Sequence, residues 1–225
     1  MDSIIQNAVA KGRRVLSEHD SKQVIASAGL RVNREKLALS RDEALAIAAE
    51  IGYPVVLKGS SDKAAHKTEM GLVKLKLTNA EDVGLAYDEI TAKGVELDGV
   101  LVGEMIASER EFVMGLSRDP QFGPCVMFGI GGIFTEAIKD VTFRVAPITE
   151  HDAEEMIDEI RMSKLLGAFR GKPAVDRAAL VRALVALGDL GYRSNEIAEI
   201  DINPVLIDGD SPVAVDALVI LKKFE

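Results

Sequence analysis

The chain has 225 residues, of which 48% are hydrophobic, 28% are charged and 4% are aromatic, so a core large enough for one domain or two small lobes must be mostly aliphatic. The formal net charge of −9 argues against a nucleic-acid partner, because proteins that bind nucleic acids usually carry a basic face. The N-terminal stretch lacks the apolar core of a secretory signal, and no apolar run approaches the roughly 20 residues that span a bilayer.

The first half of the chain alternates helical and strand patterns. Asp20, Ser40 and Asn79 are candidate capping residues for three helices, and the Ser40–Glu43 spacing is that of a capping box. The expected helices cover residues 20–28, 40–52 and 79–94, and the expected strands cover 54–59, 71–77 and 99–106. This alternation is typical of an α/β protein.

The second half contains more strand. Expected strands cover 110–119, 123–132, 140–148, 196–207 and 211–221, and expected helices cover 150–161, capped by Thr149, and 176–191. This content predicts two sheets flanked by helices. We expect an N-terminal extension over residues 1–19, a first lobe over 20–106 and a second lobe over 107–225.

Four stretches carry candidate binding residues. Lys58 ends an apolar strand, where a buried cation is costly without an anion, so it either binds a phosphate or extends its ammonium to water. Gly129, Gly131 and Gly132 either let a ligand approach the backbone or form a tight hairpin turn.

Arg144 occupies the middle of a strand. It shares one strand face with Thr142, whereas Val141, Phe143 and Val145 share the other. We therefore expect Arg144 to point away from the core, either into a cleft as a phosphate clamp or into solvent.

Oxygen donors gather near the C-terminus. Asp201 and Asn203 alternate with isoleucines and so face the same side of a strand, and Asp216 is one acid within an apolar strand. Three such donors on adjacent strands suit Mg²⁺ carried by a nucleotide, although edge-strand polarity is an alternative.

The histidines are few. His66 lies in a loop of small and charged residues, between Lys63 and Lys67, whereas His19 and His151 are expected in solvated helix-end positions. The three histidines and the single Cys125 form no ligand-spaced cluster, so a zinc site is not expected. One cysteine excludes an intramolecular disulfide and is typical of a reducing cytoplasm.

Taken together, long stretches resemble the ATP-grasp β subunit or domain of ADP-forming (NDP-forming) acetyl-CoA and acyl-CoA synthetases, which are related to succinyl-CoA synthetase. The resemblance covers nearly the whole chain and is carried by "GYPVVLKGSS", "HKTEMGLVKLKL", "REFVMGLSRDPQFGPCVMFGIGGIFTEAIKDVTFRVAPIT", "LLGAFRGKPAVD" and "EIDINPVLI…VAVDA". One difference is that Leu72 follows Gly71, where such proteins often have a second glycine.

The resemblance implies an ATP-grasp fold that binds ATP or ADP between two lobes. The resemblance implies that Lys58 contacts the phosphates and that Gly103, Glu104 and Met105 contact the adenine, with Glu111 nearby. It also implies that Gly131, Gly132 and Arg144 bind the phosphoryl end of the nucleotide. Asn203 and Asp216 are implied to bind Mg²⁺. His66, in the loop 60–71, is implied to carry a phosphoryl group. Its neutral imidazole can accept one near pH 7, and the flanking lysines would stabilise the product.

The expected reaction is acyl-CoA + ADP + phosphate ⇌ acid + CoA + ATP. The chain lacks a recognisable CoA-binding half, so we expect a CoA-binding α subunit as partner, in an α2β2 heterotetramer. Two alternatives stay open: a free-standing ATP-grasp carboxylate–amine ligase, which needs no histidine, and a nucleotide-binding regulatory module without turnover. The expected location is the cytoplasm, with no membrane or nucleic-acid partner.

Overall fold

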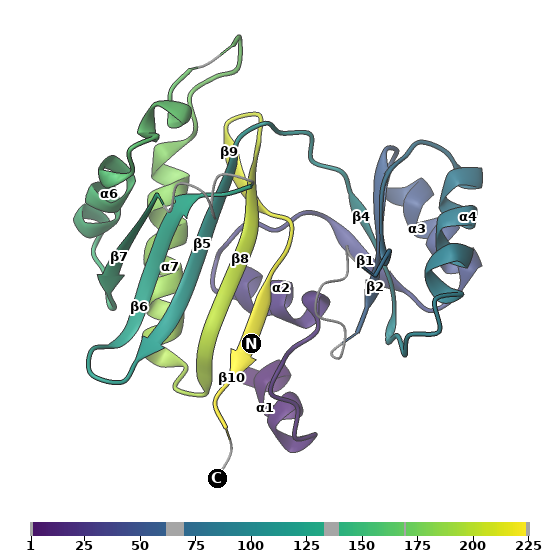
Figure 1. Ribbon diagram of the computed structural model, residues 1–225, viewed down its shortest axis with the longest axis horizontal. Coiled ribbons are helices and arrows are strands. Elements are labelled where there is room, and N and C mark those ends of the chain that lie inside the picture. Colours follow the sequence, from purple (N-terminus) through teal and green to yellow (C-terminus); the bar gives the residue numbers. More distant parts are fainter. Residues whose placement is uncertain (1, 62–69, 133–139, 169, 224–225) are drawn as a thin grey trace. The chain divides into compact units, whose positions relative to one another are not determined.

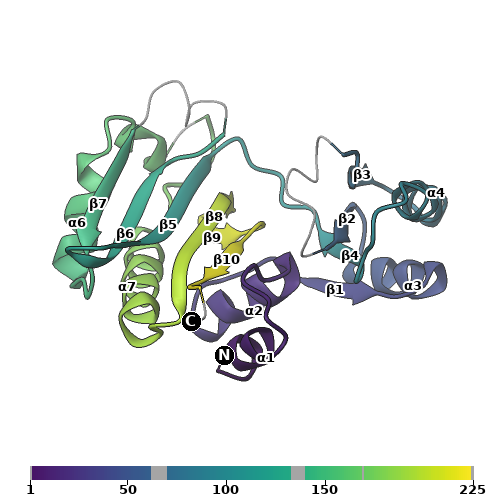
Figure 2. The same ribbon diagram turned by 60° about the horizontal axis from the view of Figure 1, so that its bottom comes forward.

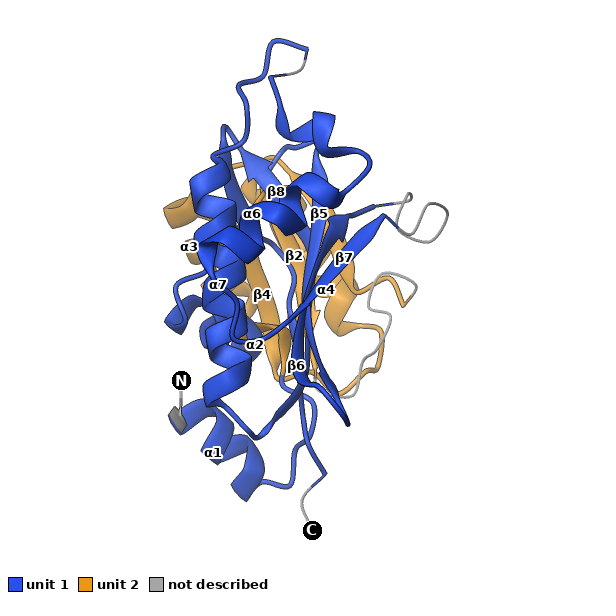
Figure 3. Ribbon diagram, turned by 90° about the vertical axis from the view of Figure 1, so that its left-hand side faces the viewer, with its two compact units in different colours: residues 1–16, 20–32, 106–225 blue, residues 17–19, 33–105 orange. Residues whose placement is uncertain are grey.

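The computed structural model describes residues 2–61, 70–132, 140–168 and 170–223 (Figure 1). Two compact units divide the chain. The larger unit contains Met1–Leu16, Asp20–Val32 and Ile106–Glu225, and the smaller unit contains Ser17–His19 and Asn33–Met105 (Figure 3). Both units combine helices with an antiparallel sheet, which confirms the expected α/β class and the expectation of two sheets.

The smaller unit is a four-stranded sheet with helices on one face (Figure 1). The strand order is β1-β4-β2-β3, with β1 at Glu35–Ala38, β2 at Val55–Ser60, β3 at Val73–Leu77 and β4 at Gly99–Glu104. Helices α3 (Arg41–Ile51) and α4 (Ala80–Thr91) bury an aliphatic core against it. As the sequence predicts, Ser40 and Asn79 cap these helices. Each side chain accepts a hydrogen bond from the backbone amide three residues later in the chain.

The larger unit is a six-stranded sheet in the order β10-β8-β5-β6-β7, with β9 paired to β8. Its strands are β5 (Glu111–Asp119), β6 (Gly123–Ile130), β7 (Val141–Val145), β8 (Ile197–Asp208), β9 (Ser211–Ala214) and β10 (Leu218–Leu221). Helices α6 (Glu150–Glu159) and α7 (Arg177–Arg193) pack on one face of β5, β6 and β7, and Figure 2 shows this layer from a second side. A short 3₁₀ turn, η1 (Ser163–Leu166), lies between them in the chain.

The N-terminal segments belong to the larger unit, which differs from the expected lobe boundaries. Helix α1 (Asp2–Ala10) and most of α2 (Glu18–Ser27) are in this unit, although we expected residues 1–19 to form an extension and 20–32 to belong to the first lobe. The reason is burial: Ile5, Val24 and Ile25 are part of the larger core. The Ser21 hydroxyl also accepts a hydrogen bond from the Val219 amide at 3.0 Å. Sequence patterns did not reveal α1 or β1.

The last expected strand is interrupted. The sequence pattern predicts one strand over residues 211–221, but the structure has β9 and β10 separated by residues 215–217. Asp216 therefore lies between two strands and not inside one. The break follows from the partners, because β9 pairs with one end of β8 at Val205–Asp208 and β10 with the other end at Ile197–Asp201.

Candidate functional site

Lys58 lies in the middle of β2, between Val73 of β3 and Leu101 of β4 in the sheet register. Its side chain is 13% exposed, and its Nζ lies 2.7 Å from Oε1 of Glu18, whose side chain is 1% exposed. The cation therefore has the anion that its burial demands. The sequence indicated the need for an anion but not its source, because Glu18 is 40 residues away.

The end of β4 places Gly103, Glu104 and Met105 next to β2, where Gly103 pairs with Val56 and Glu104 with Val55. A side chain at position 103 would come within 2.8 Å of the Asn33 amide nitrogen, so glycine fits a tightly packed position. The Glu104 carboxylate binds both the backbone amide of Arg34 at 2.8 Å and its guanidinium at 2.7 Å. These contacts hold the strand end whose backbone is expected to face adenine.

Glu111, Gly131 and Gly132 lie together in the larger unit. The Gly131 amide donates to the Glu111 carbonyl at 2.8 Å. A Cβ on Gly131 would lie 2.9 Å from the Phe112 carbonyl oxygen, and one on Gly132, which has a φ of +71°, would lie 2.7 Å from the Glu111 carboxylate. Close backbone atoms explain the glycine at residue 131, the positive φ explains the glycine at residue 132, and the backbone there lies next to a carboxylate.

Asn203 and Asp216 also come close in the fold. Asn203 is exposed on β8 and precedes Pro204 through a cis peptide bond, and the Val215 amide donates to the Pro204 carbonyl at 3.2 Å. Because Val215 precedes Asp216 and Pro204 follows Asn203, this hydrogen bond brings the two candidate residues near each other. As predicted, Ile200 and Ile202 are buried while Asn203 is on the opposite strand face.

Asp201 adds negative charge beside this pair. Burial raises the pKa of the Asp201 carboxyl, and the nearby charges of Glu199 and Asp216 raise it further. A cation bound at this position would relieve the repulsion between the carboxylates. The donor set, two carboxylates and an amide, fits a hard cation such as Mg²⁺. In the part of the chain that the structure describes, no group of three or more His, Cys, Asp and Glu side chains could by itself hold a metal ion.

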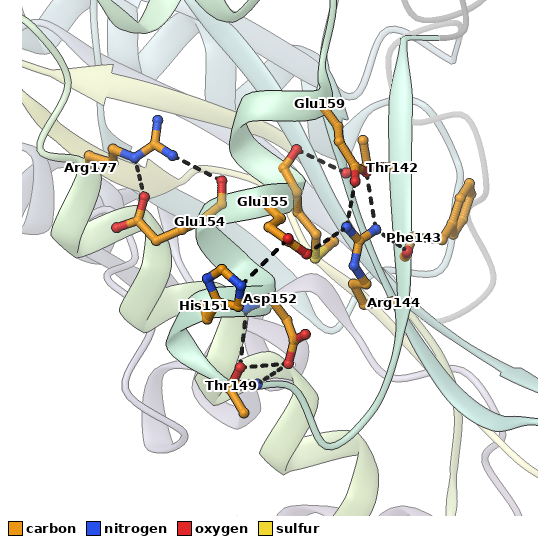
Figure 4. A network of polar contacts seen from close by, with 11 residues as sticks. Thr142, Phe143, Arg144, Thr149, His151, Asp152, Glu154, Glu155, Glu159 and Arg177 are labelled. Atoms are coloured by element: carbon orange, nitrogen blue, oxygen red, sulfur yellow. Dashed lines mark hydrogen bonds and ion pairs between the residues drawn. The ribbon is translucent and has the colours of Figure 1, made fainter.

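Arg144 lies on the strand face opposite to the expected one (Figure 4). Thr142, its neighbour on that face, is 8% exposed and donates to the Met156 carbonyl of α6 at 3.2 Å. Phe143 and Val145, expected to point into the core, are 53% and 49% exposed. The prediction that Arg144 points away from the core was therefore wrong, because α6 covers the face that carries the polar residues.

The Arg144 guanidinium forms an ion-pair network with α6. It donates to Glu159 at 2.5 and 3.1 Å and to Glu155 at 3.4 Å (Figure 4). Its bond to Glu159 raises the pKa of Arg144, and the same bond lowers the pKa of Glu159. His151 approaches Glu155 at 3.5 Å from the same helix. The described structure thus places the Arg144 guanidinium against carboxylates of α6.

Some predicted features fall outside the described residues. His66 and its neighbours Lys63 and Lys67 lie in the undescribed range 62–69. A hollow of about 350 Å³ among α2, α6 and α7, and one of about 390 Å³ among α6, η1 and α7, are lined by residues other than the candidates. No helix in the described ranges is long and apolar enough to cross a membrane.

Comparison with known proteins supplies the family. A model described as "ATP-grasp domain" matches residues 7–221. The β subunit of ADP-forming acetate–CoA ligase I from Pyrococcus furiosus is 43% identical over 224 residues, which are 97% of this chain and 96% of that subunit. The chain belongs to the ATP-grasp β subunits of ADP-forming acetate–CoA ligases. The isoenzyme II β subunit of the same organism is 42% identical, over 97% of each chain.

Solved structures of this ATP-grasp family match along the full chain. Acetyl-coenzyme A synthetase 1 of Ca. Korarchaeum cryptofilum, in complex with coenzyme A, Ca-AMPCP and HgCl⁺, gives a TM-score of 0.94 at 44% identity, covering 98% of this chain and 99% of that one. Another structure of that protein, at a TM-score of 0.89 and 43% identity over the same shares, contains a phosphorylated phosphohistidine segment. These matches confirm the ATP-grasp fold.

The same family also occurs as part of longer proteins. ADP-forming acetate–CoA ligase I of Archaeoglobus fulgidus is 36% identical over 226 residues, which are 98% of this chain but 33% of that protein. The β-subunit relatives and the longer relatives therefore carry the same ATP-grasp region in two different chain organisations.

Proposed function

We propose that this chain is the nucleotide-binding β subunit of an ADP-forming acyl-CoA synthetase, which interconverts acyl-CoA, ADP and phosphate with acid, CoA and ATP through phosphohistidine intermediates. The 43% identity to an acetate–CoA ligase β subunit over almost its whole length carries this proposal. Solved relatives are described with coenzyme A, with Mg-AMPPCP and with a phosphohistidine segment pointing towards the nucleotide-binding site, which supports the same chemistry here.

The residues of the smaller unit would hold the nucleotide. The ammonium of Lys58 would bind its phosphates, and the backbone of Gly103, Glu104 and Met105 would face the adenine. The position of Lys58 at 13% exposure supports this role, because a positive charge in a nearly dry environment binds phosphate more strongly than a solvated one. The bonds from Glu104 to Arg34 would keep the adenine-facing backbone rigid.

The residues of the larger unit would serve the phosphoryl end. Asn203 and Asp216 would hold Mg²⁺. The backbone at Gly131 and Gly132, with Glu111 beside it, would line the position of the phosphoryl group. When bound, Mg²⁺ neutralises phosphate charge. The carboxylates of Asp201 and Asp216 would keep the cation and its nucleotide in place, and catalysis would be mostly positioning and charge neutralisation. Arg144 belongs to this set by resemblance, although its ion pairs with Glu155 and Glu159 compete with that role.

His66 would carry the phosphoryl group. In the direction that consumes ATP, a neutral imidazole nitrogen of His66 would attack the γ-phosphorus of ATP, and the P–O bond to ADP would break so that ADP leaves. The P–N bond of the phosphohistidine would then break as its phosphoryl group passes to an acceptor. The acceptor would be a histidine of a CoA-binding α subunit, in an α2β2 heterotetramer in the cytoplasm. The name "subunit beta" of the P. furiosus relatives supports the need for such a partner.

A CoA-dependent assay after native co-purification tests the proposal. The tagged chain should retain a CoA-binding protein from extract of its own cells, and the complex should form ATP from acyl-CoA, ADP and phosphate. ATP consumption that needs a carboxylic acid and an amine, and no CoA, would instead support a carboxylate–amine ligase. Nucleotide binding without any turnover by the complex would support the regulatory module.

A further inference from the structure

The ion pair of Glu18 and Lys58 differs from the other ion pairs described in the smaller unit. Its two side chains are 1% and 13% exposed, whereas those of Lys36 and Glu50 are 54% and 63% exposed. Salt and water screen a buried pair far less than an exposed pair. Both residues belong to the smaller unit, so the 2.7 Å contact lies within one compact body.

Glu18 is fixed beside the ammonium. It is the first residue of α2, where the partial positive charge of a helix N-terminus favours a carboxylate. Its burial leaves the side chain little freedom to turn to water when another anion arrives. We therefore expect Glu18 to stay in place while a phosphate binds to Lys58.

The geometry of an ammonium group brings the two anions close together. It has three N–H donors in tetrahedral directions, and Glu18 Oε1 accepts from one of them. A phosphate oxygen that binds another donor comes to about 4.5 Å from that carboxylate oxygen, given ordinary hydrogen-bond lengths. At such a distance in a poorly solvated position, like charges repel strongly.

We infer that Glu18 is a resident counter-ion that weakens the hold of Lys58 on phosphate and so favours nucleotide release. The inference rests on the proposed phosphate-binding role of Lys58. Glu18 acts through Lys58 and through charge, so it is a positioning residue and does not take part in bond formation. An enzyme that binds and releases nucleotide in each turnover benefits from a lysine whose attraction for phosphate is partly offset by a neighbouring carboxylate.

Calorimetric titration of the full chain with ADP and with adenosine, both with Mg²⁺, tests this inference. Glu18→Gln should tighten ADP binding at least tenfold, which is about 1.4 kcal/mol, and should leave adenosine binding unchanged. The matched control is Glu50→Gln, which removes one negative charge from the same unit at an exposed pair and should change neither affinity. A merely structural glutamate would not tighten binding of only the phosphorylated ligand.

Two further variants keep the test decisive. Lys58→Gln leaves Glu18 without this cation and should weaken ADP binding at least tenfold, about 1.4 kcal/mol. The double variant Glu18→Gln/Lys58→Gln removes attraction and repulsion together, so its ADP affinity should stay within about threefold of wild type. It should also fold if Glu18→Gln does not, because replacing both members of a buried pair costs little.

The outcomes separate this inference from the proposed role of Lys58. If Lys58→Gln binds ADP like the wild type, Lys58 is no phosphate ligand and both ideas are wrong. If Lys58→Gln binds weakly while Glu18→Gln binds ADP no tighter than wild type, only the counter-ion inference is wrong. A double variant that binds ADP as weakly as Lys58→Gln also overturns the counter-ion inference, since the charge of Glu18 then does not weaken ADP binding.

Discussion

The guanidinium of Arg144 on β7 donates to the carboxylate of Glu159 on α6 at 2.5 Å, so the edge strand of the larger sheet is tied to the helix that covers it. Arg144 therefore has a structural task within this unit, besides the phosphoryl role that the family resemblance gives it. The two roles make different demands on the side chain. Anchoring α6 needs mainly a positive charge, whereas clamping a phosphoryl group needs the planar, two-pronged guanidinium.

We predict that Arg144→Lys separates these roles. The variant should keep a melting temperature close to wild type, because an ammonium still meets Glu159. It should nevertheless slow ATP formation by the assembled enzyme at least tenfold, about 1.4 kcal/mol of activation free energy, if the fork contacts the phosphoryl group. Arg177→Lys is the matched control, since Arg177 binds Glu154 and Asp158 of the same helix. Wild-type turnover by Arg144→Lys would leave Arg144 a purely structural residue.

The Arg144–Glu159 pair should also make stability depend on pH. The pair lowers the pKa of Glu159 in the folded chain, so its stabilising effect is present above the ordinary glutamate pKa and is lost as pH falls through the lowered one. Arg144→Gln should therefore melt below wild type near neutral pH, and the difference in melting temperature should narrow as the pH falls below the ordinary glutamate pKa and through the lowered one. Thermal unfolding at several pH values measures this. A gap that stays constant with pH would mean that the exposed pair contributes nothing measurable.

The sequence predicted most helix caps correctly and distant contacts poorly, although Asp20, an expected cap, lies inside α2. Ser40, Asn79 and Thr149 were recognisable as caps because each bonds an amide three residues along, and all three bonds are present. The Glu18–Lys58 pair joins residues 40 positions apart, and no spacing rule points to it.

Strand alternation shows which residues share a face but not which face the fold covers. Phe143 and Val145 are apolar yet exposed, while Thr142 and Arg144 face α6. The choice depends on α6, whose ten residues include six acids, so a polar strand face meets a charged helix. The strand face of Asn203 was predicted correctly, because the isoleucines with which it alternates are buried.

The metal assignment predicts a loss of nucleotide binding in Asp216→Ala. Removing the Asp216 carboxylate, one of the proposed Mg²⁺ ligands, should weaken Mg-ADP binding at least tenfold, about 1.4 kcal/mol. ADP without Mg²⁺ should bind the variant and the wild type alike, which separates loss of the metal from loss of the nucleotide contacts. Asp208→Ala, at an exposed ion pair with Arg31 in the same sheet, is the control and should behave as wild type. Unchanged Mg-ADP affinity in a folded Asp216→Ala would remove Asp216 from the site.

The last prediction concerns His66, which the family resemblance makes the phosphoryl carrier. Incubation of the complete enzyme with γ-labelled ATP and Mg²⁺ should place an acid-labile, base-stable label on this chain, because a phosphohistidine P–N bond breaks in acid. His66→Ala should abolish the label and stop net ATP formation from acyl-CoA. It should leave nucleotide affinity nearly intact, because the proposed adenine, phosphate and metal contacts belong to other residues.

The matched control for that experiment is His151→Ala. His151 lies on α6 with a side chain that is 82% exposed, so its loss should change neither the label nor turnover. The half reaction among acyl-CoA, phosphate and the α-subunit histidine should survive in His66→Ala, since it does not need this loop. A lost overall reaction with a retained half reaction identifies a carrier, because a misfolded subunit would also lose nucleotide binding. Full turnover by His66→Ala would mean that phosphoryl transfer bypasses His66 and that the nucleotide reaches the α-subunit histidine directly.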